Sequence, residues 1–463
     1  MRGIFKAVAA VSLLAQSTTA IDLTLGDPAS VKSAASTIAY GLVKYYTGNN
    51  TGDTPGNLPD PYFWWEAGAM FGTLIDYWFL TGDTSYNEIT TQAMLHQAAP
   101  TADFMPQNQT RTLGNDDQGF WAMAAMSAAE NNYPNPPADQ PQWLAIVQAV
   151  FNQYASRWDE ETCGGGLRWQ IFTFNNGFNY KNSISNGCFF NIAARLARFT
   201  GNQTYADWAD KIYNWEVAAG LILPNGDIYD GVGIKNTNDC SSTDQIQWSY
   251  NHGIFLHGSA VMYNLKKNTS DTAAVSLWQG RVDTILKSTT ELFFNNTIMI
   301  EQFCEEPGFC DNDQRSFKGY LTRWLSGTAQ MAPYTFDTIS PLLKSDAVAA
   351  AKACTGDPAT GFKGIPGTAC GFKWTTGGFD GMVGVGEQMN ALDAVMYTLA
   401  DRVSTPVTAE TGGTSAGNPS AGVSSTMPYK QLAEIKLGDR VAAGFLTSAM
   451  VFSVIGGCAF VMI

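Results

Sequence analysis

Apolar residues recur at helical spacing along most of the chain, in segments of about 12 to 20 residues between Ser30 and Val403. Alternation with a period of two, which is typical of half-buried strands, is almost absent. The pattern predicts eleven helices, at residues 33–46, 62–80, 118–130, 143–158, 185–199, 205–219, 250–265, 273–293, 318–332, 341–353 and 387–400. We expect a twelfth helix that boundary errors of the usual size conceal.

The same turn occurs twice between predicted helices. Residues 79–86 read Phe-Leu-Thr-Gly-Asp-Thr-Ser-Tyr and residues 199–205 read Phe-Thr-Gly-Asn-Gln-Thr-Tyr, so Gly82 and Gly201 can each provide a left-handed helix end. The helix before the turn is rich in aromatic residues and the helix after it is more charged, as expected of an inner and an outer helix. Six hairpins of about 60 residues predict an all-α fold, an (α/α)6 toroid with six inner and six outer helices. A superhelical solenoid is the alternative, but short loops and one aromatic-rich core favour closure.

Both ends of the chain carry targeting patterns. Residues 1–20 combine two basic residues, an apolar run and a small-residue stretch, which predicts a secretory signal peptide. We expect the folded domain to span residues 21–403. A Ser/Thr/Gly-rich stretch, residues 404–426, predicts a linker with the attachment site of a glycosylphosphatidylinositol (GPI) anchor, and residues 427–463 form a polar spacer and an apolar tail that is removed. An ordinary single-pass tail is the alternative.

Composition narrows the possible partners. The 463 residues include 41 acidic and 27 basic ones, and the formal net charge is −14. Such a charge disfavours nucleic-acid binding. With three histidines and no Cys-x-x-Cys pair, we expect no metal centre and no cofactor, although oxygen-ligated calcium stays possible.

Cysteines and glycosylation sequons are consistent with secretion. Seven cysteines precede the predicted tail, so an oxidising compartment should leave one thiol unpaired, and we expect that thiol to be buried. Cys304 with Cys310 and Cys354 with Cys370 close the shortest loops, but spacing leaves the connectivity open. The predicted glycosylation sites are Asn49, Asn108, Asn202, Asn268 and Asn295.

Two adjacent carboxylates enter a predicted aromatic helix, where residues 113–121 read Leu-Gly-Asn-Asp-Asp-Gln-Gly-Phe-Trp. Helix capping is one explanation, because Asn and Asp are preferred at helix starts. Glycoside hydrolysis is another, since it needs one carboxyl group to attack the anomeric carbon and a second to protonate the leaving oxygen. Close like charges raise the proton affinity of one of them. The acid pair alone leaves both explanations open, and Asp116 and Asp117 are the candidates for catalytic residues. Flat surfaces for sugar rings are available on Trp64, Trp65, Phe120, Trp121, Trp169, Trp248, Tyr250 and Trp374.

Several other polar residues are candidates for binding sugar hydroxyls. Asp230 and Asp60 are acids in predicted turns, where a purely structural role is the alternative. His96 is expected on a helix surface. The candidates at the starts of predicted inner helices, for which capping and packing are the alternative, are Asn186, Tyr250, Asn251 and His252.

Four motifs together resemble those of glycoside hydrolase family 76, and the resemblance spans about residues 21–402. They are Asn-Asp-Asp-Gln at 115–118, Gly-Gly-Leu-Arg-Trp at 165–169, Lys-Asn-Ser-Ile-Ser-Asn at 181–186 and Trp-Ser-Tyr-Asn-His-Gly at 248–253. The resemblance implies an (α/α)6 fold and retaining action on α-1,6-linked mannose. It also implies that Asp116 is the nucleophile and Asp117 the acid/base.

With its two terminal signals, the chain is similar to the fungal GPI-anchored branch of this family, the mannan endo-1,6-alpha-mannosidases implicated in cell-wall assembly. This similarity implies an α-1,6-mannan or GPI-glycan substrate and a possible β-glucan acceptor, which would make the enzyme a transglycosidase. It places the protein outside the cell, lipid-anchored at the outer face of the plasma membrane and the cell wall. The alternative is a non-catalytic carbohydrate-binding wall protein with the same fold.

Overall fold

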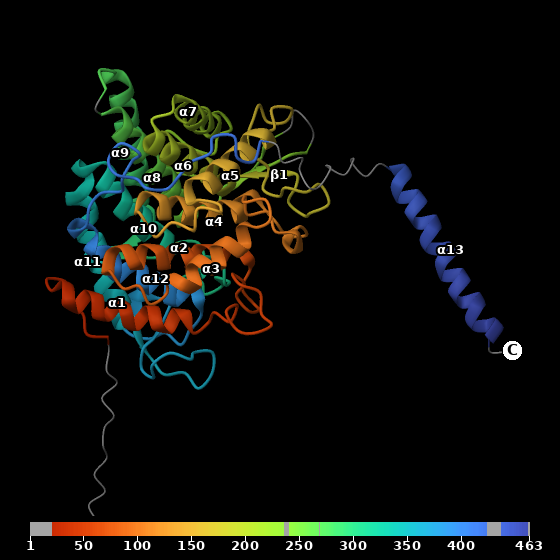
Figure 1. The fold of residues 1–463 in the computed structure, drawn as a ribbon, viewed down its shortest axis with the longest axis horizontal. Coiled ribbons are helices and arrows are strands. Elements are labelled where there is room, and N and C mark those ends of the chain that lie inside the picture. Colours follow the sequence, from red (N-terminus) through yellow and green to blue (C-terminus); the bar gives the residue numbers. More distant parts are fainter. Residues whose placement is uncertain (1–20, 236–239, 268, 424–436, 462–463) are drawn as a thin grey trace, which may run out of the picture.

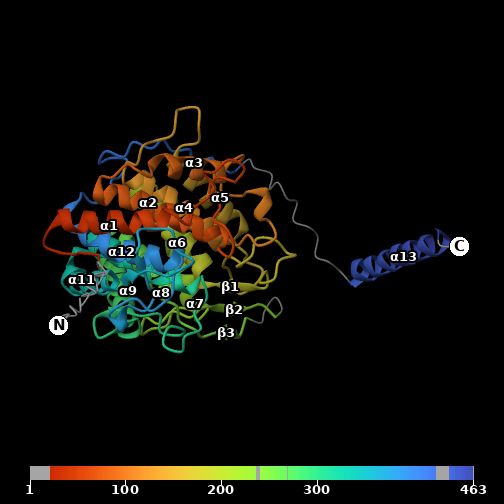
Figure 2. The same cartoon turned by 90° about the horizontal axis from the view of Figure 1, so that it is seen from below.

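The structure is a computed structural model that describes residues 21–235, 240–267, 269–423 and 437–461. Within this part of the chain, six inner helices form a ring and six outer helices surround it (Figures 1 and 2). Each inner helix contacts the next, and α12 contacts α2, so the ring is closed. The predicted (α/α)6 toroid is confirmed. The inner helices are α2 (Trp64–Thr81), α4 (Asn115–Glu130), α6 (Ser183–Thr200), α8 (Ser249–Lys266), α10 (Phe317–Met331) and α12 (Val385–Met396).

The outer helices each cover an inner partner. They are α1 (Pro28–Val43), α3 (Asn87–Ala98), α5 (Trp143–Arg157), α7 (Gln203–Ala218), α9 (Thr272–Leu292) and α11 (Phe336–Ala353). Helix α3 is the one that the sequence pattern concealed, because its few apolar residues are weakly periodic. His96 lies exposed on α3, as predicted.

Burial follows the inner and outer roles. Almost every side chain of α2 is buried, whereas α7 buries one stripe and exposes the rest. Gly82 and Gly201 end α2 and α6 with φ of 80° and 69°, and their N–H groups donate to the carbonyls of Trp78 and Ala197. The repeated turn is therefore the predicted left-handed cap.

Short strands lie at the rim where the inner helices α4, α6, α8 and α10 begin. Strands β1 (Tyr180–Asn182), β2 (Gly231–Gly233) and β3 (Ser242–Asp244) form an antiparallel sheet in that order. This sheet holds the chain that enters α6. The remaining elements are β4 (Phe294–Asn295), β5 (Ile298–Met299), β6 (Cys354–Gly356), β7 (Ala369–Cys370), η1 (Gln107–Gln109), η2 (Gln314–Ser316), η3 (Pro333–Thr335), η4 (Trp374–Thr376), η5 (Tyr397–Arg402) and α13 (Leu437–Val461).

Within the described ranges three disulfides are formed, and both of the short loops identified from the sequence are closed. The pairs are Cys163–Cys240, Cys304–Cys310 and Cys354–Cys370. Cys188, on the inner helix α6, is free and buried, as we expected of the unpaired thiol.

Four of the five predicted glycosylation sites are exposed, and the fifth, Asn268, lies outside the described residues. The exposed ones are Asn49, Asn108, Asn202 and Asn295. Their positions leave room for a glycan. Asn202 is also the N-cap of α7, where its side chain accepts a hydrogen bond from the Thr204 N–H.

The stretch from Ser404 to Val423, which we name the C-terminal strap, corrects the prediction of a linker. It lies against the folded body, close to α5 and α6 (Figure 1). Ser415 is buried, and its hydroxyl accepts a hydrogen bond from the Leu144 N–H in the first turn of α5 at 3.0 Å. A Cβ on Gly422 would lie 2.7 Å from the Ala149 carbonyl oxygen, so the small residue permits close packing. The small residues of this stretch allow close contact with α5 and with the ends of α4 and α6.

The predicted signal peptide and most of the predicted spacer lie outside the described residues. Helix α13 falls within the predicted spacer and tail. None of the helices in the described ranges is long and apolar enough to cross a membrane.

Candidate active site

Helix α4 begins at the cleft rim, and the segment that precedes β1 fixes its first residue. The Asn115 N–H donates to the Trp169 carbonyl at 2.8 Å, and the Asn115 side chain donates to the Arg168 carbonyl at 2.7 Å. Gly114 pairs with Gln170 in an antiparallel bridge. These contacts orient the two acidic residues that follow.

Asp116 and Asp117 both receive backbone hydrogen bonds. The Asp117 N–H donates to Oδ1 of Asp116 at 3.0 Å, and the Asn182 amide donates to its Oδ2 at 3.4 Å. Oδ2 of Asp117 accepts the Gly114 N–H at 2.6 Å, so this carboxylate caps the start of α4. The capping explanation is therefore correct for Asp117, yet both side chains also line a cavity.

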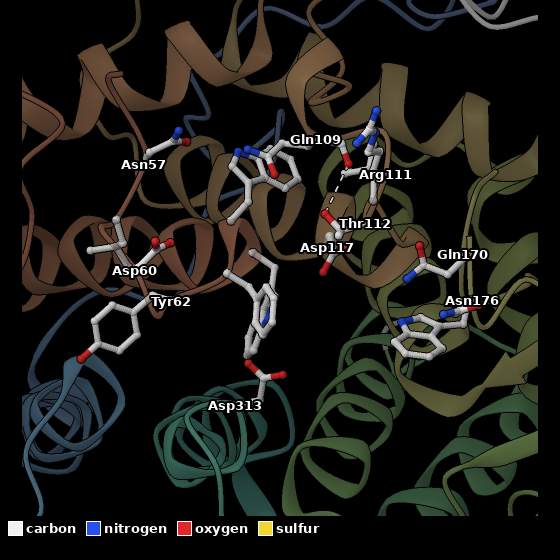
Figure 3. Close-up of a pocket in the computed structure, with 16 residues that line it drawn as sticks. Asn57, Asp60, Tyr62, Gln109, Arg111, Thr112, Asp117, Gln170, Asn176 and Asp313 are labelled. Atoms are coloured by element: carbon white, nitrogen blue, oxygen red, sulfur yellow. Dashed lines mark hydrogen bonds between the residues drawn. The ribbon is translucent and has the colours of Figure 1, made fainter. Parts of the chain in front are cut away.

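Two adjoining cavities meet at the acid pair. The large cavity, of about 590 Å³, and the small cavity, of about 260 Å³, share Trp65, Asp117, Trp169 and Asp313. Asp116 lines the small cavity but not the large one. Figure 3 shows Asp117 near the middle of the large cavity, with Asp313 facing it from below. Any chain that occupies both cavities passes Asp117.

The large cavity has polar and aromatic walls. Asn57, Asp60 and Tyr62 lie on one side of it, and Gln170 and Asn176 on the other (Figure 3). It is also lined by Leu58, Phe63, Trp64, Gln109, Arg111, Thr112 and Leu113.

Burial and mutual repulsion hold a proton on the acid pair. Burial, then the charge of Asp117, raises the pKa of Asp116 well above its ordinary value. Burial raises the pKa of Asp117 to about 7, with the Gly114 N–H lowering it and the charge of Asp313 raising it further. The pair titrates as a unit and retains one proton near neutral pH.

Tyr250, Asp230 and Trp65, three of the predicted sugar-binding residues, line the small cavity. The Tyr250 ring stacks on Phe317 at 3.9 Å and forms an aromatic wall. Asp230 accepts a hydrogen bond from the Tyr180 hydroxyl at 2.7 Å, and burial raises its pKa to about 6. Trp65 borders both cavities.

Asn186, Asn251 and His252 are not among the residues that line the two cavities, which corrects the prediction that they face the cleft. All three are fully buried. Asn186 bonds the backbone N–H and carbonyl of Leu167. Asn251 donates to Asp230 at 3.5 Å, and the His252 ring contacts Phe293. Their roles are packing and support of the cleft.

Asp313 is a cavity residue that the sequence reasoning missed. It precedes η2, and its Oδ1 is buried without a hydrogen-bond partner. Burial and the charge of Asp311 together raise the pKa of Asp313 to about 6. An acid close to the start of an inner helix, as at Asp116, was the available signal. Tyr180, Asn182, Gln314 and Phe317 also line the small cavity and were not predicted.

Among the described residues, no cluster of three or more His, Cys, Asp or Glu side chains could hold a metal ion. Lys181, a buried cation beside the site, donates to three backbone carbonyls and pairs with the Asp159 carboxylate.

A closed double ring of helices, with an adjacent acid pair between two aromatic cavities, defines a glycoside hydrolase. The family model of glycosyl hydrolase family 76 matches residues 30–410, and the chain belongs to this family. Mannan endo-1,6-alpha-mannosidase DCW1 of Saccharomyces cerevisiae is 46% identical over 95% of this chain and 94% of its own length. Mannan endo-1,6-alpha-mannosidase DFG5 of the same yeast is 42% identical, covering 96% and 95%.

Solved structures share the fold. Dfg5 from Chaetomium thermophilum, in complex with glucosamine, has a TM-score of 0.81 and 45% identity over 87% of this chain and 98% of that one. An alpha-1,6-mannanase of Salegentibacter has a TM-score of 0.60 and 16% identity over 81% and 99%. That structure is an inactive variant, with asparagine in place of two consecutive aspartates, in complex with alpha-1,6-mannotriose.

Proposed function

We propose that this enzyme is a retaining, endo-acting glycosidase on α-1,6-linked mannose chains. The observation that carries the proposal is the position of Asp116 and Asp117, side by side where two cavities meet. The mannan endo-1,6-alpha-mannosidase names of relatives at 42–46% identity support the choice of substrate.

The carboxylate of Asp116 acts as the nucleophile. In this assignment Asp116 is ionised, a form that the N–H groups of Asp117 and Asn182 stabilise, and the proton that the pair retains is on Asp117. Asp116 attacks C1 of a mannosyl unit while Asp117 gives its proton to the departing glycosidic oxygen. Asp117 then takes a proton from the incoming hydroxyl group, whose oxygen bonds to C1 and displaces Asp116. Two inversions at C1 restore the α configuration.

The cavities take different parts of the substrate. Because Asp116 lines only the small cavity and not the large one, the mannosyl unit that it attacks occupies the small cavity. Asp117 borders both cavities, so the leaving group, and later the acceptor, occupies the large one. We name the small cavity the donor side and the large cavity the acceptor side.

The acceptor side favours a sugar over water. Its volume of about 590 Å³ and its mixture of amides, Arg111 and tryptophans suit a carbohydrate chain. We infer a transglycosidase that joins the glycan of GPI-linked mannoproteins to wall β-glucan. The predicted signal and tail place this activity at the outer face of the plasma membrane and in the cell wall. Because the strap packs against α5 up to Gly422, the lipid attachment would follow that residue.

Covalent trapping and product analysis test the proposal. An activated fluoro-mannoside should label the peptide that contains Asp116, and Asp116→Asn should abolish both labelling and cleavage of α-1,6-mannan without lowering the melting temperature. The first products should be α anomers by NMR. Added β-glucan oligosaccharide should yield a mannosyl-glucan product. β-Anomeric products would exclude retention, labelling at another residue would exclude Asp116, and free sugars alone would exclude transfer to glucan.

A further inference from the structure

Two phenylalanines beside the donor side are exposed. The side chains of Phe303 and Phe309 are 42% and 55% exposed. Phe309 lies within the loop that the Cys304–Cys310 disulfide closes, and Phe303 directly precedes that loop. The two rings meet edge to face with centroids 5.4 Å apart. We name this pair the aromatic ledge. Exposed aromatic clusters commonly mark binding surfaces.

The loop beneath the ledge is firmly held. Glu305 is buried and accepts the Glu301 N–H at 2.9 Å and the Lys318 ammonium at 3.0 Å. The N–H groups of Gly308 and Phe309 both donate to the Cys304 carbonyl. A rigid, exposed aromatic surface loses little conformational entropy when a ligand binds.

The ledge continues the wall of the small cavity. Trp248 lines that cavity and contacts Phe303 edge to face at 5.4 Å. Trp248 also contacts Phe317, which stacks on Tyr250 inside the cavity. Aromatic faces therefore follow one another from the acid pair outwards to Phe309.

Charge identifies the kind of ligand. Residues 302–313 contain no lysine or arginine, and two of their four acidic residues, Glu306 and Asp311, are exposed. This surface repels anionic lipid headgroups and anionic polymers. A neutral glycan can pack its apolar ring faces against the phenylalanines without a charge penalty.

We propose that Phe303 and Phe309 form an additional carbohydrate-binding site, which holds the units of an α-1,6-linked mannan chain that extend beyond the small cavity on the donor side. The inference rests on the proposed function for the identity of the sugar. It predicts that the enzyme prefers long donor chains and that this preference resides in the ledge.

Chain-length dependence of binding tests the ledge. Calorimetry would use the protein carrying Asp116→Asn, to prevent turnover, and α-1,6-linked mannose oligosaccharides of two to six units. We expect affinity to rise with length, and Phe303→Ala combined with Phe309→Ala to weaken hexaose binding roughly tenfold while mannobiose binding is unchanged. The matched control is Tyr334→Ala. Tyr334 is 42% exposed and contacts Tyr263, but follows the end of α10 away from the cleft.

The following outcomes would contradict the proposal that the aromatic ledge binds the donor chain. Equal hexaose affinity with and without the two phenylalanines would overturn it, as would the same loss in Tyr334→Ala. Loss of mannobiose binding, with an unchanged melting temperature, would assign the residues to the catalytic cavity. If vesicles of phosphatidylcholine and phosphatidylserine bound the protein only with the phenylalanines present, the ledge would be a membrane contact. Failure of every mannose oligosaccharide to bind would overturn the proposed substrate as well.

Discussion

The carboxylate of Asp117 accepts the backbone N–H of Gly114 at 2.6 Å, so the side chain that we propose as acid/base also caps helix α4. The cap fixes the rotamer of a group that must meet a glycosidic oxygen. Structural and chemical roles therefore coincide in one residue, and substitution can separate them.

Asp117→Asn should separate the proton from the cap. Asparagine keeps an acceptor oxygen for the Gly114 N–H but cannot supply a proton, so kcat on α-1,6-mannan should fall by about 10²- to 10⁴-fold at an unchanged melting temperature. An aryl mannoside with a good leaving group needs no proton for departure and should lose much less in the first step, which a stopped-flow burst measures. Asp117→Ala should additionally lower the free energy of unfolding by about 1 kcal/mol. Equal losses on both substrates would contradict the acid/base role.

The pH profile should respond to Asp313. Asp117 must be protonated for the first step, so kcat/KM should fall as the pH rises through its pKa of about 7. The charge of Asp313 helps to raise that pKa. Asp313→Asn should therefore move the falling limb to lower pH, as initial rates between pH 4 and pH 9 would show. An unchanged limb, or a shift to higher pH, would exclude this electrostatic contribution.

The fold was predictable because inner and outer helices differ in composition. An inner helix such as α6 is buried on all sides, and its aromatic residues and glycines record this in the sequence. Helix α3 was missed since an outer helix with few apolar residues leaves no such record. The strap was misjudged because small residues are typical both of linkers and of segments that pack closely.

The sequence indicated the acid pair through its adjacency, its aromatic setting and the family motifs, but it did not indicate the direction of single side chains. Tyr250, Asn251 and His252 follow one another at a helix start, where successive side chains point about 100° apart. Only Tyr250 among them lines the small cavity. Asp313 escaped notice because its position depends on how a loop before η2 folds back across the ring.

Glu216 should make the protein less stable as the pH rises. Burial raises its pKa to about 8, with the Ser183 hydroxyl lowering it and Asp230 raising it. The folded state thus retains a proton that the unfolded state releases near pH 4.5, so this contribution is complete below pH 4.5 and is lost as the pH rises through 8. The melting temperature should decrease from pH 5 to pH 8, and less so in Glu216→Gln. Identical slopes for the two proteins would contradict the assignment.

Lys181 should be essential to the loop that orients the start of α4. Its buried ammonium donates to the carbonyls of Asp159, Thr162 and Gly165 and pairs with the Asp159 carboxylate at 3.3 Å. Lys181→Met leaves these acceptors unpaired and should lower the free energy of unfolding by about 3 kcal/mol, measured by urea denaturation.

Lys211→Met provides the control for Lys181. Lys211 pairs with Glu160 at 2.8 Å on the surface, so its loss should cost at most about 1 kcal/mol. Equal effects of the two substitutions would show that the buried ammonium contributes no more than a surface ion pair.

The C-terminal strap should behave as part of the folded domain. A chain that ends at Val423 should melt like the longer protein, whereas one that ends at Val403 loses the contacts with α5 and α6 and should melt several degrees lower. Ser415→Ala isolates one contact: it removes the acceptor for the Leu144 N–H and should cost about 1 kcal/mol. Ser420→Ala is the control, because Ser420 is an exposed strap residue. If both truncated chains melted at the same temperature, the strap would be a linker, as its composition alone suggested.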